Sequence, residues 1–285
     1  MGERARGTFK EFLSSGSGKV GLAFITVLII VSLGVVITYP ADFGLKYWSN
    51  PILWADNPRA APPAWVNLFS SNNQAETVIF EASVPSERVP GVNTTKVLYT
   101  FDLNYDADEP PSFTSMTVEN IIYNNRPPVL IVNIERPDGK KIELYRLIVP
   151  GPLPNEETPF TRFSDMPFRI QLSGDSEAVS AVSNFLKQEF DVSISDQYLL
   201  LSGVDIAVFG TPQDYGEFDV LRGLYKIQVD AFLNNENDSI GNVKFVVGGS
   251  VHGFMGTDTL GRDLSIGLLF GFPVALFIGL VASSI

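Results

Sequence analysis

Two long apolar segments near the ends of this 285-residue chain restrict its fold more than any other feature. The first, residues 20–39, carries no charge, and a helix of about twenty residues spans about 30 Å, the thickness of the hydrocarbon core of a bilayer. The second follows Asp263 and contains no charged residue up to Ile285. The pattern therefore predicts a membrane protein in which two transmembrane α-helices, residues 20–39 and 264–285, flank the rest of the chain.

The first apolar segment has two interpretations, an uncleaved anchor or a cleaved signal peptide. A signal peptide has an apolar region of about 7–15 residues that ends in small residues, whereas this segment is longer and ends in Thr38, Tyr39 and Pro40. The anchor is therefore favoured. Residues 1–19 have a net charge of +2, and basic flanks favour the cytoplasm. We expect a multi-pass protein of the plasma (cytoplasmic) membrane, with residues 1–19 cytoplasmic and residues 40–262 extracytoplasmic.

The composition excludes several functions. The chain has no cysteine, which removes disulfides, thiolate metal sites and cysteine nucleophiles. His252 is its only histidine, which argues against a Ser-His-Asp triad and against a multi-histidine zinc site. The net charge of −12 lies almost wholly between the apolar segments, and such an acidic body without a basic cluster argues against nucleic acid. We expect no enzyme activity and no cofactor.

The middle of the chain divides into a proline-punctuated, extended juxtamembrane segment, residues 40–74, and a β-rich domain, residues 75–250. In the domain, short β-type runs recur between turn signals. Pro137, Asp138 and Gly139 separate two of these runs as a hairpin turn does. One helix is predicted at residues 175–190, with Asp175 as its N-cap. We predict a mainly-β, sandwich-like domain with one helix. The predicted strands are residues 77–84, 96–103, 115–123, 129–135, 141–149, 168–172, 198–209 and 225–232.

Other residues in this middle region have both a functional and a structural interpretation. Trp48, Trp54 and Trp65 fit either the outer membrane interface or packing beneath the domain. Asn93 and Asn237 begin Asn-X-Ser/Thr patterns, which are glycosylation acceptors when they lie outside the cell, although such short patterns also arise by chance. The acidic groups at 106–109 and 156–157 lack the spacing of a calcium loop, which favours solvated surface.

The residues just before the second apolar segment, GTDTLGRD at 256–263, have a clear local chemistry. Thr257 and Asp258 can cap a helical turn, and Asp263 can cap the helix that descends into the membrane. Gly256 and Gly261 allow tight backbone turns, whereas Arg262 can stay at the headgroup level or pair with a carboxylate. A well-capped membrane helix explains these residue types but not their ordered combination. Residues 251–263 are therefore predicted to lead the chain into the membrane.

The ordered combination resembles the permease subunits of ABC importers of the peptide/nickel class. The resemblance rests on Gly256, Thr257, Asp258, Gly261, Arg262 and Asp263, which match a GTD-x-x-GRD pattern before a membrane helix. A glycine and an SLxIGL-like run follow without a gap, at Gly271, Leu276, Ile278, Gly279 and Leu280. The middle domain is larger than the connection usual in this family and resembles an insertion of archaeal relatives.

The resemblance implies transport of peptides or related solutes across the membrane. Its expected partners are a second permease subunit, ATPase subunits and an extracytoplasmic solute-binding protein. The family has six membrane helices and a loop that couples to the ATPase, so this chain is expected to be an amino-terminal portion. The alternative is a membrane-anchored β-sandwich surface protein that serves adhesion, envelope structure or sensing. An ectoenzyme is the weakest hypothesis, because no nucleophile or carboxylate pair stands out.

Overall fold

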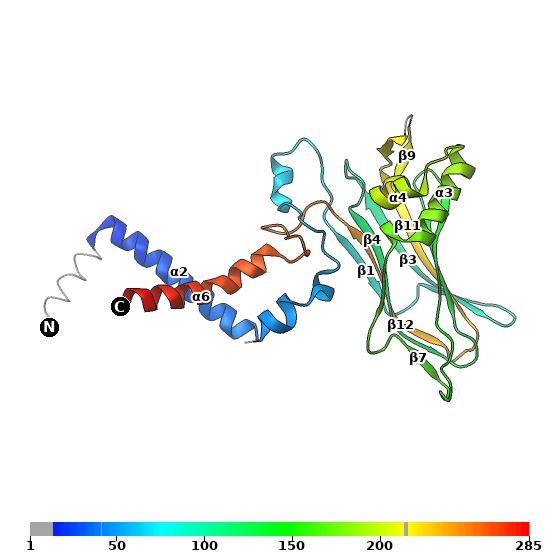
Figure 1. The fold of residues 1–285 in the computed structure, drawn as a ribbon, viewed down its shortest axis with the longest axis horizontal. Coiled ribbons are helices and arrows are strands. Elements are labelled where there is room, and N and C mark those ends of the chain that lie inside the picture. The colour runs from blue at the N-terminus through cyan, green and yellow to red at the C-terminus, as the bar shows by residue number, and fades with distance from the viewer. Residues whose placement is uncertain (1–13, 41, 214–215, 285) are drawn as a thin grey trace.

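The two apolar segments form long helices that lie beside each other. The computed structural model describes residues 14–40, 42–213 and 216–284, so the predicted cytoplasmic residues 1–13 lie outside the described residues. The helices α2 (Gly16–Thr38) and α6 (Leu264–Ser284) are both long and apolar enough to cross a membrane. They contact each other and extend from the same side of the β domain (Figure 1). Most of their large side chains are exposed, as expected of helices whose solvent is lipid.

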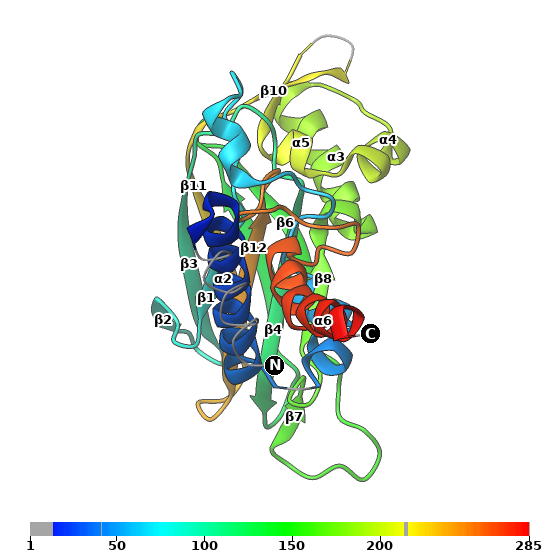
Figure 2. The ribbon, with the colours of Figure 1, turned by 90° about the vertical axis from the view of Figure 1, so that its left-hand side faces the viewer.

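The remaining described chain is mainly β, with two five-stranded antiparallel sheets. The first sheet has the order β1-β12-β4-β7, with β8 also paired to β4, and the second has the order β2-β3-β11-β5-β6. The first sheet lies on the side of the domain that faces α2 and α6 (Figures 1 and 2). Its strands are β1 (Val78–Ala82), β12 (Ser239–Gly248), β4 (Phe113–Tyr123), β7 (Phe160–Arg162) and β8 (Phe168–Gln171). The second sheet contains β2 (Glu87–Pro90), β3 (Thr95–Tyr105), β11 (Gly223–Leu233), β5 (Val129–Glu135) and β6 (Lys141–Ile148).

One hydrophobic core lies between the two sheets. Along β5 and β6 buried residues alternate with more exposed ones, because successive side chains of a strand point to opposite faces. The rings of Phe80 in β1 and Phe101 in β3 stack with their centroids 5.4 Å apart, which joins the first sheet to the second. Val118 of the first sheet and Val132 of the second belong to the same buried cluster. The predicted sandwich-like arrangement therefore agrees with the packing of the described strands.

Helices close one end of the domain (top of Figure 1). The predicted helix is α3 (Ser176–Phe190), and Asp175 caps it by accepting hydrogen bonds from the backbone N–H groups of Glu177 and Ala178. It packs against β6. The prediction of a single helix was incomplete, because α4 (Asp196–Ser202) and α5 (Asp205–Val208) follow it. A short two-stranded sheet, β9 (Gly210–Pro212) with β10 (Phe218–Val220), and a 3-10 turn, η4 (Leu172–Gly174), complete this end.

The prediction of a strand at residues 198–209 was wrong. The segment is helical because Ser195 accepts a hydrogen bond from the N–H of Tyr198 and Asp196 stands in the first turn, both helix-start signals. Leu199 is buried while its neighbours Leu200 and Leu201 are exposed, which is one face of a helix. The sequence prediction also missed β12, whose polar residues Asn242 and Lys244 interrupt the apolar run.

The juxtamembrane segment is less extended than predicted. Three short helical turns interrupt it, a π-helical turn η1 (Gly44–Trp48) and the 3-10 helices η2 (Pro51–Trp54) and η3 (Ala64–Leu68). At η2 the side chain of Asn50 accepts a hydrogen bond from the N–H of Ile52, and Pro51 occupies the first turn, where its missing N–H costs nothing. The segment thus runs beside the start of α6 before it reaches β1.

Candidate functional site

The six residues of the GTD-x-x-GRD pattern lie in the loop that joins β12 to α6, against the juxtamembrane segment. Hydrogen bonds join residues 256–263 to residues 57–61 at several points. We call residues 256–263 together with residues 54–61 the clasp. It sits between the first sheet and the first turn of α6 (Figure 1).

Thr257 forms the centre of the clasp. Its side chain is 5% exposed, and its hydroxyl donates a hydrogen bond to the carbonyl of Pro58 (2.7 Å). The same oxygen accepts a hydrogen bond from the N–H of Ala61 (3.0 Å). The backbone N–H of Thr257 donates to the carbonyl of Ala61 (2.9 Å), and the N–H of Ala60 donates to the carbonyl of Asp258 (2.8 Å). The expectation that Thr257 caps a helical turn was therefore wrong, since its hydroxyl joins two distant segments.

Asp258 and Arg262 form a closed turn. One carboxylate oxygen of Asp258 accepts hydrogen bonds from the N–H groups of Leu260 and Arg262, both at 2.9 Å. The other lies 2.7 Å from the Arg262 guanidinium, which confirms that Arg262 pairs with a carboxylate. Desolvation alone would raise the pKa of Asp258, but these hydrogen bonds from Arg262 and Leu260 lower the pKa below its usual value. Asp258 is therefore a stable anion in this turn.

The Arg262 guanidinium also contacts the juxtamembrane segment. It lies over the ring of Trp48, 4.6 Å from the centroid, a cation–π distance. The ring of Trp48 reaches α6 at Gly267, where an added Cβ would lie only 2.6 Å from the ring. Trp48 also packs edge-on against Trp54, which is buried. The packing interpretation of these two tryptophans agrees with these contacts, and Trp48 lies beside the first turn of α6.

The two glycines of the pattern allow close contact between the two halves of the clasp. Gly256 and Gly261 have φ of +76° and +80°, a left-handed backbone conformation that residues with a Cβ rarely adopt. A Cβ on Gly256 would lie 2.2 Å from the carbonyl oxygen of Ala61, and one on Gly261 would lie 2.9 Å from that of Trp54. The expected tight backbone at both glycines is confirmed, and its cause is the approach of residues 54–61.

Asp263 begins the second helix. Its carboxylate accepts a hydrogen bond from the N–H of Ser265 (2.8 Å), which confirms the predicted cap at the start of α6. The Nε2 atom of His252 lies 3.7 Å from the other carboxylate oxygen. The only histidine of the chain thus stands beside a capping carboxylate and not within a catalytic group.

The clasp can position a helix, but it holds no reactive arrangement. The Thr257 hydroxyl binds backbone groups of residues 58 and 61, and the Asp258 carboxylate binds backbone N–H groups and the Arg262 guanidinium. No nucleophile lies beside a base in the clasp. Among residues 14–40, 42–213 and 216–284, no group of three or more His, Asp and Glu side chains could hold a metal ion. Pro58, Ala60 and Ala61, which bind residues 257 and 258, could not be identified from the sequence. The proline-rich composition of residues 58–63 indicates a turn-containing segment, but it does not indicate which distant residues that segment contacts.

The two predicted glycosylation acceptors lie near each other. Asn93 is exposed in the turn between β2 and β3, and Asn237 is exposed in the turn between β11 and β12. Both turns line one shallow depression. Asp238, the middle residue of the second pattern, is buried and accepts hydrogen bonds from the N–H groups of Asn124, Asn234 and Asn235. Both asparagines are accessible in the structure.

The acidic groups considered as metal or catalytic sites are used in surface contacts. Asp108 accepts a hydrogen bond from the N–H of Asn73 and pairs with Arg222. Glu156 pairs with Arg162, and the hydrogen bonds from that guanidinium lower the pKa of Glu156 to about 2. Both carboxylates are anionic partners of arginine, which agrees with the surface interpretation.

Comparison with known proteins adds no functional assignment. No protein-family model matches the chain, and no curated protein matches it. Among solved structures, a chain in the structure of infectious bursal disease virus Gt strain aligns with a TM-score of 0.16 and 12% sequence identity. That alignment covers 70% of this chain and 48% of the viral one. At these values the alignment shows neither a shared fold nor a shared function.

Proposed function

We propose that this chain is the amino-terminal part of a permease subunit of an ABC importer for peptides or related solutes. The observation that supports it is the clasp. All six residues on which the resemblance rests take part in one connected arrangement at the start of α6, through capping, ion pairing, left-handed turns and hydrogen bonds. A plain anchor needs only an apolar helix, whereas a permease needs each helix held in a defined position and orientation.

In this proposal α2 and α6 cross the cytoplasmic membrane and residues 40–262 lie outside. Support comes from the length and hydropathy of both helices, from their common side of the β domain, and from the basic residues before α2. The expected partners are a second permease subunit, ATPase subunits and a solute-binding protein. In this proposal the β domain either helps to dock the solute-binding protein or covers the mouth of the transport pathway.

The proposed orientation can be tested with single cysteines, because the natural chain has none. Val92 is 99% exposed on the β domain, and Ser17 is exposed in the first turn of α2. A membrane-impermeant maleimide is expected to label Val92→Cys in intact cells, but Ser17→Cys only after permeabilisation. The reverse pattern would invert the orientation. Recovery of the chain in the soluble fraction would refute the membrane assignment.

The transport proposal is tested through Gly256. In the source cell, Gly256→Ala in the gene that encodes this chain is expected to lower uptake of labelled peptides about tenfold or more. The added Cβ would meet the carbonyl of Ala61 in a left-handed conformation, and such local strain costs of order 1–3 kcal/mol. The strain would open the clasp and release the first turn of α6.

Gly44→Ala is the matched control, because Gly44 lies in the juxtamembrane segment that the clasp holds and an added Cβ there has nothing within 4 Å. It is expected to leave uptake unchanged, and immunoblots of the membrane fraction would show that both variants are present at wild-type level. If deletion of the whole gene leaves uptake of peptides, oligosaccharides and metal chelates unchanged, the permease proposal is wrong. The two-helix anchored surface protein would then be the better account.

A further inference from the structure

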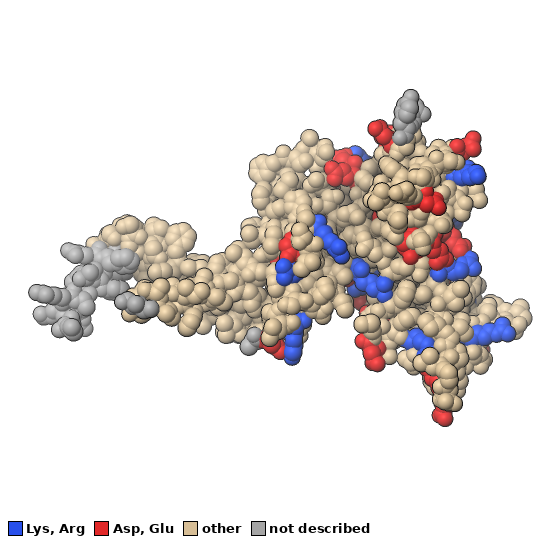
Figure 3. Space-filling view, viewed as in Figure 1, with Lys and Arg blue, Asp and Glu red and all other residues tan. Residues whose placement is uncertain are grey.

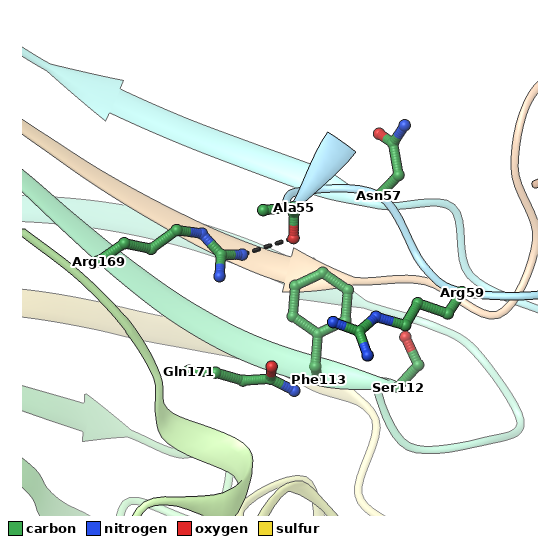
Figure 4. Close-up of a pocket in the computed structure, with 7 residues that line it drawn as sticks. All are labelled: Ala55, Asn57, Arg59, Ser112, Phe113, Arg169 and Gln171. Atoms are coloured by element: carbon green, nitrogen blue, oxygen red, sulfur yellow. Dashed lines mark hydrogen bonds between the residues drawn. The ribbon is translucent and has the colours of Figure 1, made fainter. Parts of the chain in front are cut away.

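A small cavity lies in the seam between the juxtamembrane segment and the first sheet. Its volume is about 200 Å³, and its walls come from residues 55–59, from the start of β4 and from the end of β8. Figure 4 shows the guanidinium groups of Arg59 and Arg169 on either side of the Phe113 ring, with the amide of Gln171 nearby. The ring of Phe113 packs on Gly248, where an added Cβ would lie 2.3 Å from it.

The charge of this cavity is positive in a chain whose net charge is −12. None of the described residues that line it is Asp or Glu. Asp56, next to the lining residues Ala55 and Asn57, is shared between Arg169 (3.3 Å) and Lys244 (2.6 Å). Arg59 makes no hydrogen bond or ion pair with any described residue and is exposed. Arg59, Arg169 and Lys244 together outnumber the single carboxylate of Asp56, which leaves a local formal charge of about +2.

The cavity also has hydrogen-bond donors that the protein does not use. Arg169 donates through Nη2 to the carbonyl of Ala55 and to the hydroxyl of Ser115, and through Nε to Asp56. Its Nη1 atom makes no hydrogen bond with the described residues. No nitrogen atom of the Arg59 guanidinium makes a hydrogen bond with the described residues. Two guanidinium groups with free N–H donors fit an oxyanion, and Arg suits phosphate because its planar fork can donate two bonds at once.

The position of the cavity points to the membrane surface. Asn57 lines the cavity and its side-chain amide donates a hydrogen bond to the carbonyl of Gly261 (3.0 Å), three residues before α6 begins. Several Lys and Arg side chains on the face shown in Figure 3 likewise gather where the helices meet the β domain. The headgroup layer of a bilayer crossed by α6 would lie at this level.

We propose that this cavity binds a phosphate group through Arg59 and Arg169, and that the phosphate belongs to an anionic lipid headgroup. The lipid source rests on the membrane insertion proposed above, whereas binding of a phosphate group as such does not. The Phe113 ring supplies an apolar wall, and the local positive charge matches one anionic headgroup. A bound headgroup would fix the height of the β domain above the bilayer.

The test uses the full chain in nanodiscs of phosphatidylcholine and phosphatidylglycerol in equal amounts. After mild detergent extraction, native mass spectrometry counts the phosphatidylglycerol molecules that stay bound. Arg59→Gln is expected to lower this retention about tenfold, the order of effect of one charge-assisted hydrogen-bonding group. Arg126→Gln is the matched control, since Arg126 is also exposed without a side-chain partner but lies in the turn between β4 and β5. It should retain lipid like the wild type.

A second arm separates the two sources of phosphate. Lipid-free chain in neutral detergent is titrated with inorganic phosphate by isothermal titration calorimetry. Retention of phosphatidylglycerol that depends on Arg59 supports the lipid site. Phosphate binding that depends on Arg59, without lipid retention, upholds the phosphate chemistry and overturns the lipid source. If neither ligand distinguishes Arg59→Gln from Arg126→Gln, the site is refuted even where the cysteine labelling supports membrane insertion.

Discussion

Replacement of Arg136 by methionine is expected to destabilise the β domain by about 3 kcal/mol or more, because several buried carbonyl groups lose a charged hydrogen-bond donor. The side chain of Arg136 is 0% exposed although it is charged. Its Nη1 donates hydrogen bonds to the carbonyls of Ala207, Val208 and Gly210, and Nε and Nη2 donate to Asp138. One guanidinium thus joins the turn after β5 to α5 and β9.

The aromatic face of α3 adds to this arrangement. The guanidinium of Arg136 lies 5.4 Å from the ring centroid of Phe185 and 5.6 Å from that of Phe190. Methionine keeps much of the volume but donates no hydrogen bond, so three carbonyls lose a charged donor and Asp138 loses its partner. Desolvation raises the pKa of Asp138, but hydrogen bonds from Arg136 and Lys140 outweigh it and hold the pKa below its usual value. The charged form of Asp138 is therefore stabilised by these contacts.

Urea unfolding of the purified chain in detergent, followed by tyrosine and tryptophan fluorescence, measures this effect. With slopes of about 1–3 kcal/mol per molar, the midpoint should fall by about 1 M or more. Arg146→Met is the control, because Arg146 lies in the strand that follows the same turn but is exposed and pairs only with exposed Glu143. No measurable change is expected there. Equal midpoints for Arg136→Met and wild type would show that the buried guanidinium contributes nothing to stability.

The parts of this fold that could be predicted from the sequence are those with a local cause. The helix at 176–190 follows from the cap at Asp175 and from apolar residues at helical spacing. The hairpin of β5 and β6 follows from Pro137-Asp138-Gly139, where Gly139 has a φ of +79°. The helix α4 also has a local cause, the cap at Ser195 with Asp196 in the first turn, so this helix lies among the predictable parts although residues 198–209 were predicted as a strand.

The rest could not be predicted because its cause is non-local. The strand β12 contains Gly241, Asn242 and Lys244, and it is held by pairing with β1 on one side and β4 on the other. The clasp shows the same limit at the site. The cap at Asp263 and the glycine turns could be predicted, whereas the partners of Thr257 lie 196 and 199 residues earlier in the chain. Only the folded chain brings them together.

Replacement of Asp205 by asparagine is expected to stabilise the protein at pH 8 by up to about 3 kcal/mol. Asp205 is 2% exposed, and one of its carboxylate oxygens accepts a hydrogen bond from the hydroxyl of Thr114 (2.7 Å). Its second carboxylate oxygen has no hydrogen-bond partner among the described residues. Burial raises the pKa of Asp205 to about 6, although hydroxyl hydrogen bonds oppose the shift. The folded protein therefore carries an uncompensated buried anion above that pH.

The sign of the pH dependence follows from this pKa. A folded-state pKa above the unfolded value of 3.8 means that the folded protein binds the proton more tightly. The stability from this group is complete below about pH 4 and is lost as the pH rises through 6. Between pH 5 and pH 8 the wild type should lose about 1.4 kcal/mol through Asp205, roughly one pKa unit. Asparagine stays neutral, so Asp205→Asn should lose none of it.

Chemical unfolding at pH 5, 6, 7 and 8 measures this difference. Asp102→Asn is the control, because Asp102 is exposed on β3, and its curve should follow the wild type at every pH. Burial raises the pKa of Tyr105, whose shift Asp205 increases further, so this tyrosine does not titrate in the window. Parallel curves for Asp205→Asn and wild type would mean that water or a rearrangement stabilises the anion. In that case the carboxylate of Asp205 does not oppose folding at neutral pH.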